Sequence, residues 1–373
     1  MTLRPCRILL LNERDPRHPR SGGAETHVFE IMSRLVGRGY GVTQLAAGFP
    51  GGALAEKVDG VEVRRLGPLA RYYTAAALAC ARETREARFD VVVECLNKLP
   101  FFSPLYAKAP VLALCHHLFG ETAFRQVAWP IATVVWGAER LVPLAYRRQR
   151  FLTISESTRD DLVRRGVARE RIDVSLPGIR RPRVSARPLR ERPPRVAYVG
   201  RLERYKRIDV MLRALAPLAA KHPALEIGVI GRGADRERLE ALARELGLAS
   251  RTHFLGFLDD DARDRWLADS RACVCPSEKE GWGLTVIEAN AVGTPVVASD
   301  APGLRDSVRH GETGWLAPIG DAAAFGARIA ALLEADEAAE AMALRAAAWS
   351  QRFDWDEAAR ETELAIARAR QAA

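Results

Sequence analysis

The first half of the chain alternates short apolar runs with stretches of helical periodicity. Residues 7–12 form a continuous apolar run of the kind that makes a doubly buried strand, and further strand-like stretches lie at 42–47, 61–66, 90–95, 110–115, 151–154 and 172–176. Between the first two runs, four apolar residues fall on one face of a predicted helix: Val28, Ile31, Met32 and Leu35. Further helices are predicted near 72–88, 124–149 and 157–165. This alternation predicts a parallel sheet with helices on both faces.

The pattern stops at residues 180–195, which are rich in proline and arginine and show no periodicity, so we predict a linker there. Alternation then resumes, with strands expected at 195–200, 225–230, 253–258, 271–277 and 294–299 and helices near 208–221, 234–247 and 284–292. The alanine-rich tail, 321–373, is expected to be helical. The fold class predicted is α/β, with two Rossmann-like, doubly wound domains that face a cleft.

The net charge and the distribution of basic residues bear on which partners the protein binds. The chain has a net charge of +9, and only six of its 56 basic residues are lysine. The arginines are scattered and often adjoin acids, which is typical of a solvated surface; attraction to anionic lipid or to a phosphate-bearing substrate is the alternative. The sequence has no module that interleaves basic and aromatic residues, so nucleic-acid binding is not expected.

Cysteine usage and the length of the apolar runs bear on the compartment. The six cysteines form no C-x-x-C pair, and most lie in apolar strand-like runs, as buried thiols of a reduced compartment do. The N-terminal apolar run is too short for a signal peptide, and no apolar stretch reaches the length of a membrane-spanning helix. We expect a cytoplasmic protein, with a peripheral position at the inner face of the membrane as a further option.

Candidate chemistry lies in loops that follow strands, where open α/β sheets bind their ligands. Residues 200–207 (GRLERYKR) bring Arg201 and Lys206 to a helix N-terminus, a suitable position for an anion, although an ordinary basic loop is the alternative. Gly22 and Gly23 precede the first helix, where they let a backbone approach a ligand or simply form a tight turn. His116 ends a strand, where it can hydrogen-bond a substrate hydroxyl or act only as a cap.

Two glutamates flank a Gly-Trp-Gly sequence within residues 278–297 (EKEGWGLTVIEANAVGTPVV). Glu280 lies in a loop beside glycines, where a carboxylate can accept hydrogen bonds from sugar hydroxyls. Glu288 has a structural alternative, because Thr285 and Glu288 have the spacing of a helix capping box. Asp259–Asp261 suggests either a metal-binding acid group or, as the favoured interpretation, the acidic N-terminus of a helix.

Together these segments resemble the retaining glycosyltransferases of family 4, which have the GT-B fold. The most specific part is PSEKEGWGLTVIEANAVGTPVVASDAPGLRDSV, followed by GETGWL. Other family segments are matched by GGAETHV, VLALCHHLFG, TISESTRDDL, SLPGI and VGRLERYKRID. FDWDEAARETELAIARAR resembles the family's last helix. The expected domains are therefore an acceptor-side domain at 1–181 and a nucleotide-sugar-binding domain at 182–350, with 351–373 crossing back to the first.

The resemblance implies a role for each candidate residue. Glu280 would contact hydroxyls of the donor sugar, and His116 would hydrogen-bond that sugar near the reacting carbon. Arg201 and Lys206 would neutralise the leaving diphosphate, and Glu288 would bind the nucleotide ribose. Further donor contacts, mostly through the backbone, would come from Gly22, Gly23, Gly256, Phe257, Leu258, Trp282, Gly283 and Leu284.

Three residues depart from the family pattern. Arg207 stands where the family often has glycine, His117 where an acid is frequent, and Arg232 where a small or acidic residue is common. These departures leave the class intact and leave the identity of the donor open.

The sequence therefore predicts a hexosyltransferase that moves a sugar from a UDP- or GDP-sugar to an acceptor hydroxyl, in glycolipid, polysaccharide or glycoconjugate synthesis. No cofactor and no metal are expected, because side-chain cations would serve the diphosphate. The alternatives are a sugar-nucleotide epimerase of the same fold and a non-catalytic sugar-nucleotide-binding protein. The acceptor is expected to be a glycan or lipid-linked. Residues 118–150, rich in tryptophan, apolar residues and arginine, suit an anionic membrane surface, or else pack on the sheet with their arginines in water.

Overall fold

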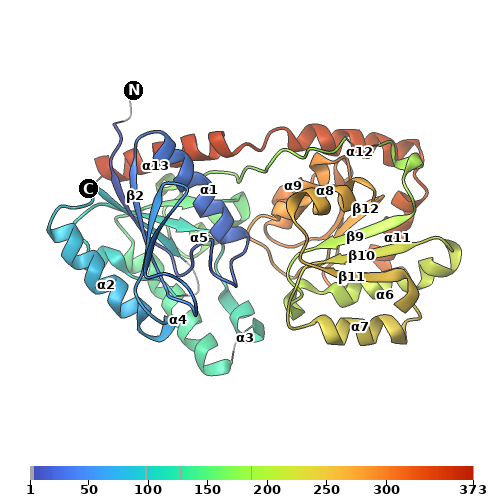
Figure 1. Ribbon diagram of the computed structural model, residues 1–373, viewed down its shortest axis with the longest axis horizontal. Coiled ribbons are helices and arrows are strands. Elements are labelled where there is room, and N and C mark those ends of the chain that lie inside the picture. Colours follow the sequence, from blue (N-terminus) through green and yellow to red (C-terminus); the bar gives the residue numbers. More distant parts are fainter. Residues whose placement is uncertain (1–3, 97–98, 127, 186, 373) are drawn as a thin grey trace. The chain divides into compact units, whose positions relative to one another are not determined.

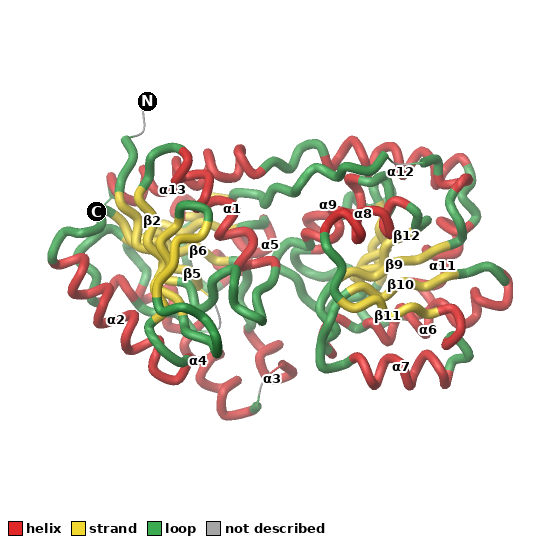
Figure 2. The backbone as a smooth tube through the Cα atoms, viewed as in Figure 1, coloured by secondary structure: helices red, strands yellow, loops and turns green. Residues whose placement is uncertain are grey.

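The chain folds into two compact α/β units, shown by a computed structural model that describes residues 4–96, 99–126, 128–185 and 187–372 (Figure 1). One unit consists of Met1–Gly178 together with Asp354–Ala373, and the other of Ile179–Phe353. In each unit a sheet lies between layers of helices (Figure 2). None of the helices in the described ranges is long and apolar enough to cross a membrane.

The first unit is built on a sheet with the strand order β3-β4-β2-β1-β5-β6-β7-β8. Its strands are β1 (Arg7–Leu11), β2 (Gly41–Ala46), β3 (Ala55–Val58), β4 (Val61–Arg65), β5 (Val91–Leu96), β6 (Val111–Cys115), β7 (Arg150–Thr153) and β8 (Ile172–Val174). All pairs are parallel except β3–β4. Sequence analysis missed β3, a short polar strand joined to β4 by Asp59 and Gly60. Both of these residues have positive φ, as a tight two-residue hairpin turn requires.

Helices cover both faces of this sheet. They are α1 (Gly23–Gly37), α2 (Leu69–Arg85), α3 (Ala123–Gln126), α4 (Trp129–Ala145), α5 (Glu156–Arg164) and α13 (Trp355–Gln371). Connections between parallel strands are right-handed, so the direction of each connection decides the face on which its helix lies. Helix α1 leads from β1 toward β2, whereas α2, α4 and α5 lead toward the opposite edge, so α1 lies on one face and the other three lie on the other. The single helix expected at 124–149 is instead two helices; Val127 lies outside the described residues, and Pro130 stands in the first turn of α4.

The last helix belongs to the first unit. Glu363 of α13 accepts hydrogen bonds from Arg38 (3.0 Å) and from the Tyr40 hydroxyl (2.8 Å), at and just beyond the end of α1. Asp354 is the N-cap of this helix, and its side chain accepts a hydrogen bond from the amide of Asp356 at 2.7 Å. The chain therefore leaves its first unit at residue 178 and returns to it at residue 354.

The second unit has a fully parallel sheet with the order β11-β10-β9-β12-β13-β14. Its strands are β9 (Arg195–Val199), β10 (Glu226–Ile230), β11 (Thr252–Gly256), β12 (Ala272–Cys275), β13 (Val296–Ser299) and β14 (Gly314–Ala317). Its helices are α6 (Ile208–Lys221), α7 (Arg236–Glu245), α8 (Asp260–Ala268), α9 (Leu284–Ala291), α10 (Leu304–Ser307), α11 (Ala322–Leu333) and α12 (Glu337–Ser350). Sequence analysis had not foreseen β14.

The proline-rich segment 180–195 packs against the second unit and is not an open linker. Leu189 is fully buried in its core, and the buried Arg192 donates to the Ser270 carbonyl (2.9 Å) and the Thr294 hydroxyl (2.8 Å). Burial lowers the pKa of Arg192 to about 10. The segment contains a short 3-10 helix, η4 (Leu189–Glu191), so absence of periodicity excluded neither local structure nor packing; Ala186 lies outside the described residues.

Strand order positions the candidate residues. In each sheet, successive strands are first added on one side of the first strand and then on the other. This change falls between β1 and β5 in the first unit and between β9 and β12 in the second. Ligands of open α/β sheets bind beyond the carboxyl ends of strands at such a reversal. The loops after β9 and β12 carry the GRLERYKR and SEKEGWG sequences.

Candidate functional site

The loop after β9 presents the basic residues of the site. The Arg201 side chain is exposed, and its guanidinium donates to the Tyr205 hydroxyl at 2.8 Å. The Lys206 ammonium forms an ion pair with Glu280, with 2.5 Å between Nζ and Oε1. Burial by itself lowers the pKa of Lys206, but the Glu280 carboxylate outweighs it and raises that pKa. Lys206 therefore remains a cation at neutral pH.

Two further contacts bind this loop to the loop after β12. The amide of Glu278 donates to the Tyr205 carbonyl at 2.9 Å. The Arg207 guanidinium donates to the Glu278 carboxylate at 2.9 Å. Arg207 itself has φ +51°, the left-handed conformation that favours glycine. The loops that carry Lys206 and Glu280 are thus held together by main-chain and side-chain bonds.

Helix α9 starts four residues after Glu280, at Leu284. Gly283 precedes its first residue, Leu284, and has φ +95°, so a side chain there would strain the turn. The Trp282 ring is buried and packs on Phe353, with 5.4 Å between ring centroids. That ring points into the unit. Residues 282–284 can therefore offer a ligand only the backbone amides of a helix N-terminus, which attract an anion.

Glu288 lies in the second turn of α9. Its carboxylate pairs with Arg263 of α8 at 3.0 Å. Burial raises the pKa of Glu288, while the positive charge of Arg263 lowers it and the carboxylates of Asp264 and Asp260 raise it further. The capping-box alternative is wrong, because α9 begins after Gly283 and Thr285 is already inside the helix.

The acidic run at 259–261 starts a helix, as the favoured interpretation held. Asp259 is the N-cap of α8, and its carboxylate accepts the Ala262 amide at 2.7 Å. Asp260 and Asp261 pair with Arg180 at 3.2 and 3.0 Å. Within the described ranges, no group of three or more His, Cys, Asp and Glu side chains is placed to hold a metal ion.

Residues 256–258 lie at the carboxyl end of β11, at the same edge of the sheet. The Gly256 carbonyl accepts the Gly231 amide at 2.7 Å, which joins the loops after β10 and β11. Phe257 is exposed, and the guanidinium carbon of Arg232 lies 5.9 Å from its ring centroid. Leu258 is half-buried.

The remaining candidates belong to the first unit. Gly22 precedes α1, whose first residue is Gly23, and the Gly22 amide donates to Glu25 at 2.8 Å. His116, at the end of β6, is only 4% exposed, and its Nε2 lies 3.2 Å from Nδ1 of His27. Burial and the neighbouring His117 lower the pKa of His116 to about 3, so the ring is neutral near pH 7.

Sequence analysis missed His27. This residue of α1 is buried, and its ring lies 5.9 Å from that of Trp355 at the start of α13. The signal was present, since His27 stands four residues before Ile31 and so continues the buried stripe of the helix. The second unit brings together Arg201, Lys206, Glu280 and residues 282–284, whereas Gly22, Gly23 and His116 gather with His27 in the first.

Comparison with known proteins assigns the family. The model for Glycosyltransferase Family 4 matches residues 21–183, and that for Glycosyl transferases group 1 matches residues 182–349. D-inositol 3-phosphate glycosyltransferase of Thermomonospora curvata is 30% identical over 383 residues, which cover 90% of this chain and 88% of that protein. Its counterpart in Acidothermus cellulolyticus is 34% identical over 243 residues, 60% of this chain; the match spans about half of that relative, 52%.

Solved structures share the architecture. Sucrose-phosphate synthase from Thermosynechococcus elongatus superposes with a TM-score of 0.81 at 23% identity, over 99% of this chain and 100% of that one. Anabaena Alr3699/HepE in complex with UDP-glucose gives 0.77 at 20% identity, over 97% and 100%. The fold is thus that of the GT-B glycosyltransferases, as the sequence predicted. The chain belongs to glycosyltransferase family 4.

Proposed function

We propose that the protein transfers a hexose-type sugar from a nucleotide diphosphate sugar to an acceptor hydroxyl. The observation that carries this proposal is the Lys206–Glu280 pair, which sets a cation beside a carboxylate where the strand order of the second sheet reverses. Family membership supports it, as does the UDP-glucose bound by the structurally similar Anabaena protein. UDP and GDP donors both fit these groups.

The chemistry requires a stabilised leaving group. Breaking a glycosyl-phosphate bond leaves extra negative charge on the diphosphate and positive charge on the sugar. Arg201, Lys206 and the amides that begin α9 would meet the developing negative charge, and preorganised groups of this kind usually contribute most to catalysis. We propose that the reaction needs no metal, because these positive groups take the place that a divalent cation would have.

Other residues would orient the donor. Glu280 would accept hydrogen bonds from sugar hydroxyls, and Glu288 from the ribose, with the backbone at Gly256–Leu258 against the base. The neutral ring of His116 would bond the sugar near the reacting carbon. In this reading no carboxylate acts as a covalent nucleophile. We propose that the acceptor attacks from the leaving group's own face, so that the anomeric configuration is retained.

The acceptor is proposed to be a hydroxyl of a glycan or a lipid-linked molecule. The relatives named above act on D-inositol 3-phosphate by name, which makes small polyols a useful first panel. We propose that the reaction takes place in the cytoplasm, in keeping with six buried cysteines, none of which forms a disulfide in the described ranges.

Turnover of a panel of UDP- and GDP-sugars, with and without acceptors, tests the proposal. Arg201→Ala, Lys206→Ala and Glu280→Gln should each lower turnover by about 10²-fold or more, because each removes a contact to donor or leaving group. Arg204→Ala is the matched control, since it removes an exposed arginine of the same loop and should change little. Wild-type turnover in all three variants would reject the site. Donor binding without transfer would favour a non-catalytic sensor, and conversion of the free donor an epimerase.

A further inference from the structure

Helix α4 buries its only acidic side chain. Ala132, Val135 and Val142 pack inward, and Glu139 lies among them at 1% exposure. The Glu139 carboxylate accepts the amides of Phe119 and Gly120 at 2.5 and 2.8 Å. The carboxylate is therefore used within the fold, and it does not contribute negative charge to the outer face of the helix.

The outer face of α4 is apolar and cationic. Five large apolar side chains project from the helix into solvent: Trp129, Ile131, Val134, Leu141 and Leu144. Trp129 is 72% exposed and Leu144 is 66% exposed. Arg140, Arg147 and Arg148 are exposed along the same helix and just beyond its end, and the Arg140 guanidinium carbon lies 3.8 Å from the Trp136 ring centroid. Isolated exposed leucines are common, but a contiguous apolar face of this kind marks an interaction site.

The same face continues over η1 and α2. Between α2 and α4 lies the segment with η1 (Ser103–Leu105), where Leu105 is exposed. Phe101 packs on Tyr73 of α2 with 4.9 Å between ring centroids, and the Phe102 amide donates to the Tyr146 hydroxyl, just after α4, at 2.9 Å. We call the outer faces of α2, η1 and α4 the α2–α4 surface; helices α2 and α4 lie on one side of the sheet (Figure 1).

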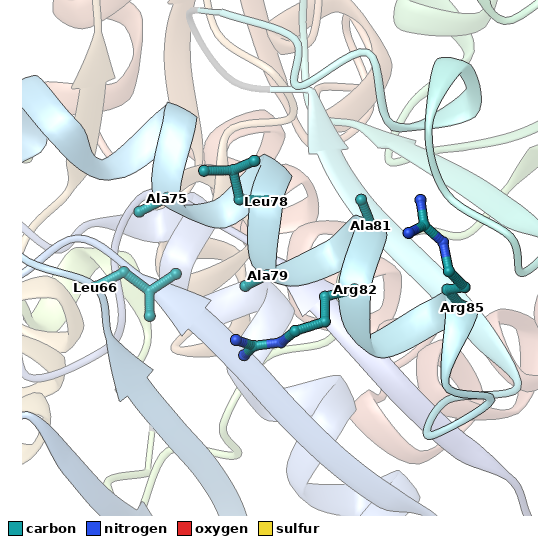
Figure 3. A pocket seen from close by; sticks show the side chains of 7 residues that line it. All are labelled: Leu66, Ala75, Leu78, Ala79, Ala81, Arg82 and Arg85. Atoms are coloured by element: carbon teal, nitrogen blue, oxygen red, sulfur yellow. The ribbon is translucent and has the colours of Figure 1, made fainter.

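Helix α2 adds a hollow with arginines at its rim. An open hollow of about 570 Å³ is lined by Leu66, Leu78 and Ala79 together with Arg82 and Arg85. Figure 3 shows these side chains on and beside α2. Leu78 and Arg82 are both exposed. The neighbouring Glu83 is buried and pairs with Arg64 at 3.2 Å. On α2, as on α4, cations stay at the surface while an acid is turned inward.

We propose that the α2–α4 surface docks on an anionic lipid bilayer. Its apolar side chains would enter the boundary between headgroups and acyl chains, and its guanidiniums would meet the lipid phosphates. A second copy of the chain fits less well, because a symmetric contact would bring like charges together. Docking is independent of the proposed transfer reaction, although it would bring a lipid-linked acceptor to the enzyme.

Sedimentation with vesicles tests the proposal. Full-length protein should bind vesicles of phosphatidylcholine with about 30% phosphatidylglycerol, release them at high salt, and ignore pure phosphatidylcholine. The triple variant Trp129→Ser, Leu141→Ser, Leu144→Ser should bind at least about tenfold more weakly. Arg147→Gln with Arg148→Gln should lose roughly fivefold for each arginine. Leu344→Ser, which changes a leucine of α12 that is 68% exposed, is the matched control and should bind normally.

Thermal unfolding separates lost binding from lost folding, and these exposed substitutions should leave the melting temperature unchanged. Protein that stays in the supernatant with anionic vesicles at low salt would overturn the proposal. So would undiminished binding by the triple variant, or equal binding to neutral vesicles. Self-association that the triple variant abolishes, without vesicle binding, would assign the surface to a second copy instead.

Discussion

At the scale of single residues, Arg207 shows how the site is held. Its left-handed backbone, φ +51°, costs a residue with a side chain about 1 kcal/mol relative to glycine. Its guanidinium contacts Asp209 at 3.3 Å and Glu278 at 2.9 Å, so it joins the start of α6 to the loop that carries Glu280. Glycine would relieve the strain and lose that bridge. Arginine at this position therefore keeps a strained backbone but holds the loop that carries Glu280 in place.

Arg207→Gly separates these two effects. Strain relief of about 1 kcal/mol and loss of a half-exposed ion-pair network worth about 0–1 kcal/mol should nearly cancel, so the melting temperature should change little. Donor turnover should nevertheless fall by about tenfold or more, because the Glu280 loop loses its tether. Arg207→Ala should lose both activity and stability, since it keeps the strain. A glycine variant with full kcat/KM would show that the bridge does not position Glu280.

At the scale of elements, α13 supports the first unit at the point where the chain leaves and re-enters it. Its first residue, Trp355, is buried and lies beside His27, which contacts His116. The Trp355 backbone also passes directly over Gly178: a Cβ on that glycine would stand 2.2 Å from the Trp355 nitrogen. The segment where the chain leaves the first unit is therefore packed against the segment where it returns.

Gly178→Ala should destabilise this junction. Main-chain atoms at such a distance cannot yield, and overpacking of this kind typically costs about 1–3 kcal/mol, which lowers the melting temperature of a unit of this size by several degrees. Differential scanning calorimetry of the full chain would measure the change. Gly37→Ala is the control, because a Cβ there meets nothing within 4 Å. Equal melting temperatures for the two variants would contradict the packing argument.

At the scale of the whole molecule, charge is arranged so that acids are largely neutralised by arginine. The acids that begin α8 pair with Arg180 and Arg263, and the carboxylate of Glu280 pairs with Lys206. An acidic group already bound to guanidinium is a poor ligand for a divalent cation. The positive groups of the second unit, in contrast, stand at the edge of the sheet where the sugar diphosphate is proposed to bind.

Activity should therefore survive a chelator. Donor turnover measured with an excess of EDTA should match the untreated rate, because Arg201, Lys206 and the amides of α9 already supply positive charge. Added Mg²⁺ or Mn²⁺ should then have no large effect. Complete loss of turnover with EDTA, restored by either metal, would instead revive the acidic run at Asp259–Asp261 as a metal site.

The sequence by itself determined the order of most elements, a fold class of two doubly wound α/β domains and the placement of motifs after strands, while its resemblance to family 4 added the GT-B fold. It could do so because apolar periodicity and turn residues act over a few neighbouring positions. The short strand β3 escaped because its residues are polar and its pairing depends on a hairpin, and Leu189 and Arg192 escaped because packing without periodicity leaves no local pattern.

Only the tertiary structure decided which partner each side chain meets. Glu288 has the spacing of a capping residue but bonds Arg263, which stands 25 positions earlier in the chain. In the sequence, His27 is one more residue of the buried face of α1. Its contact with His116 arises only because β6 lies beside that helix in the fold. The apolar and basic residues of α4 have two possible orientations, and packing on the sheet turned Glu139 inward and Leu141, Leu144 and Arg140 outward. Such choices depend on contacts between distant segments, which no local pattern contains.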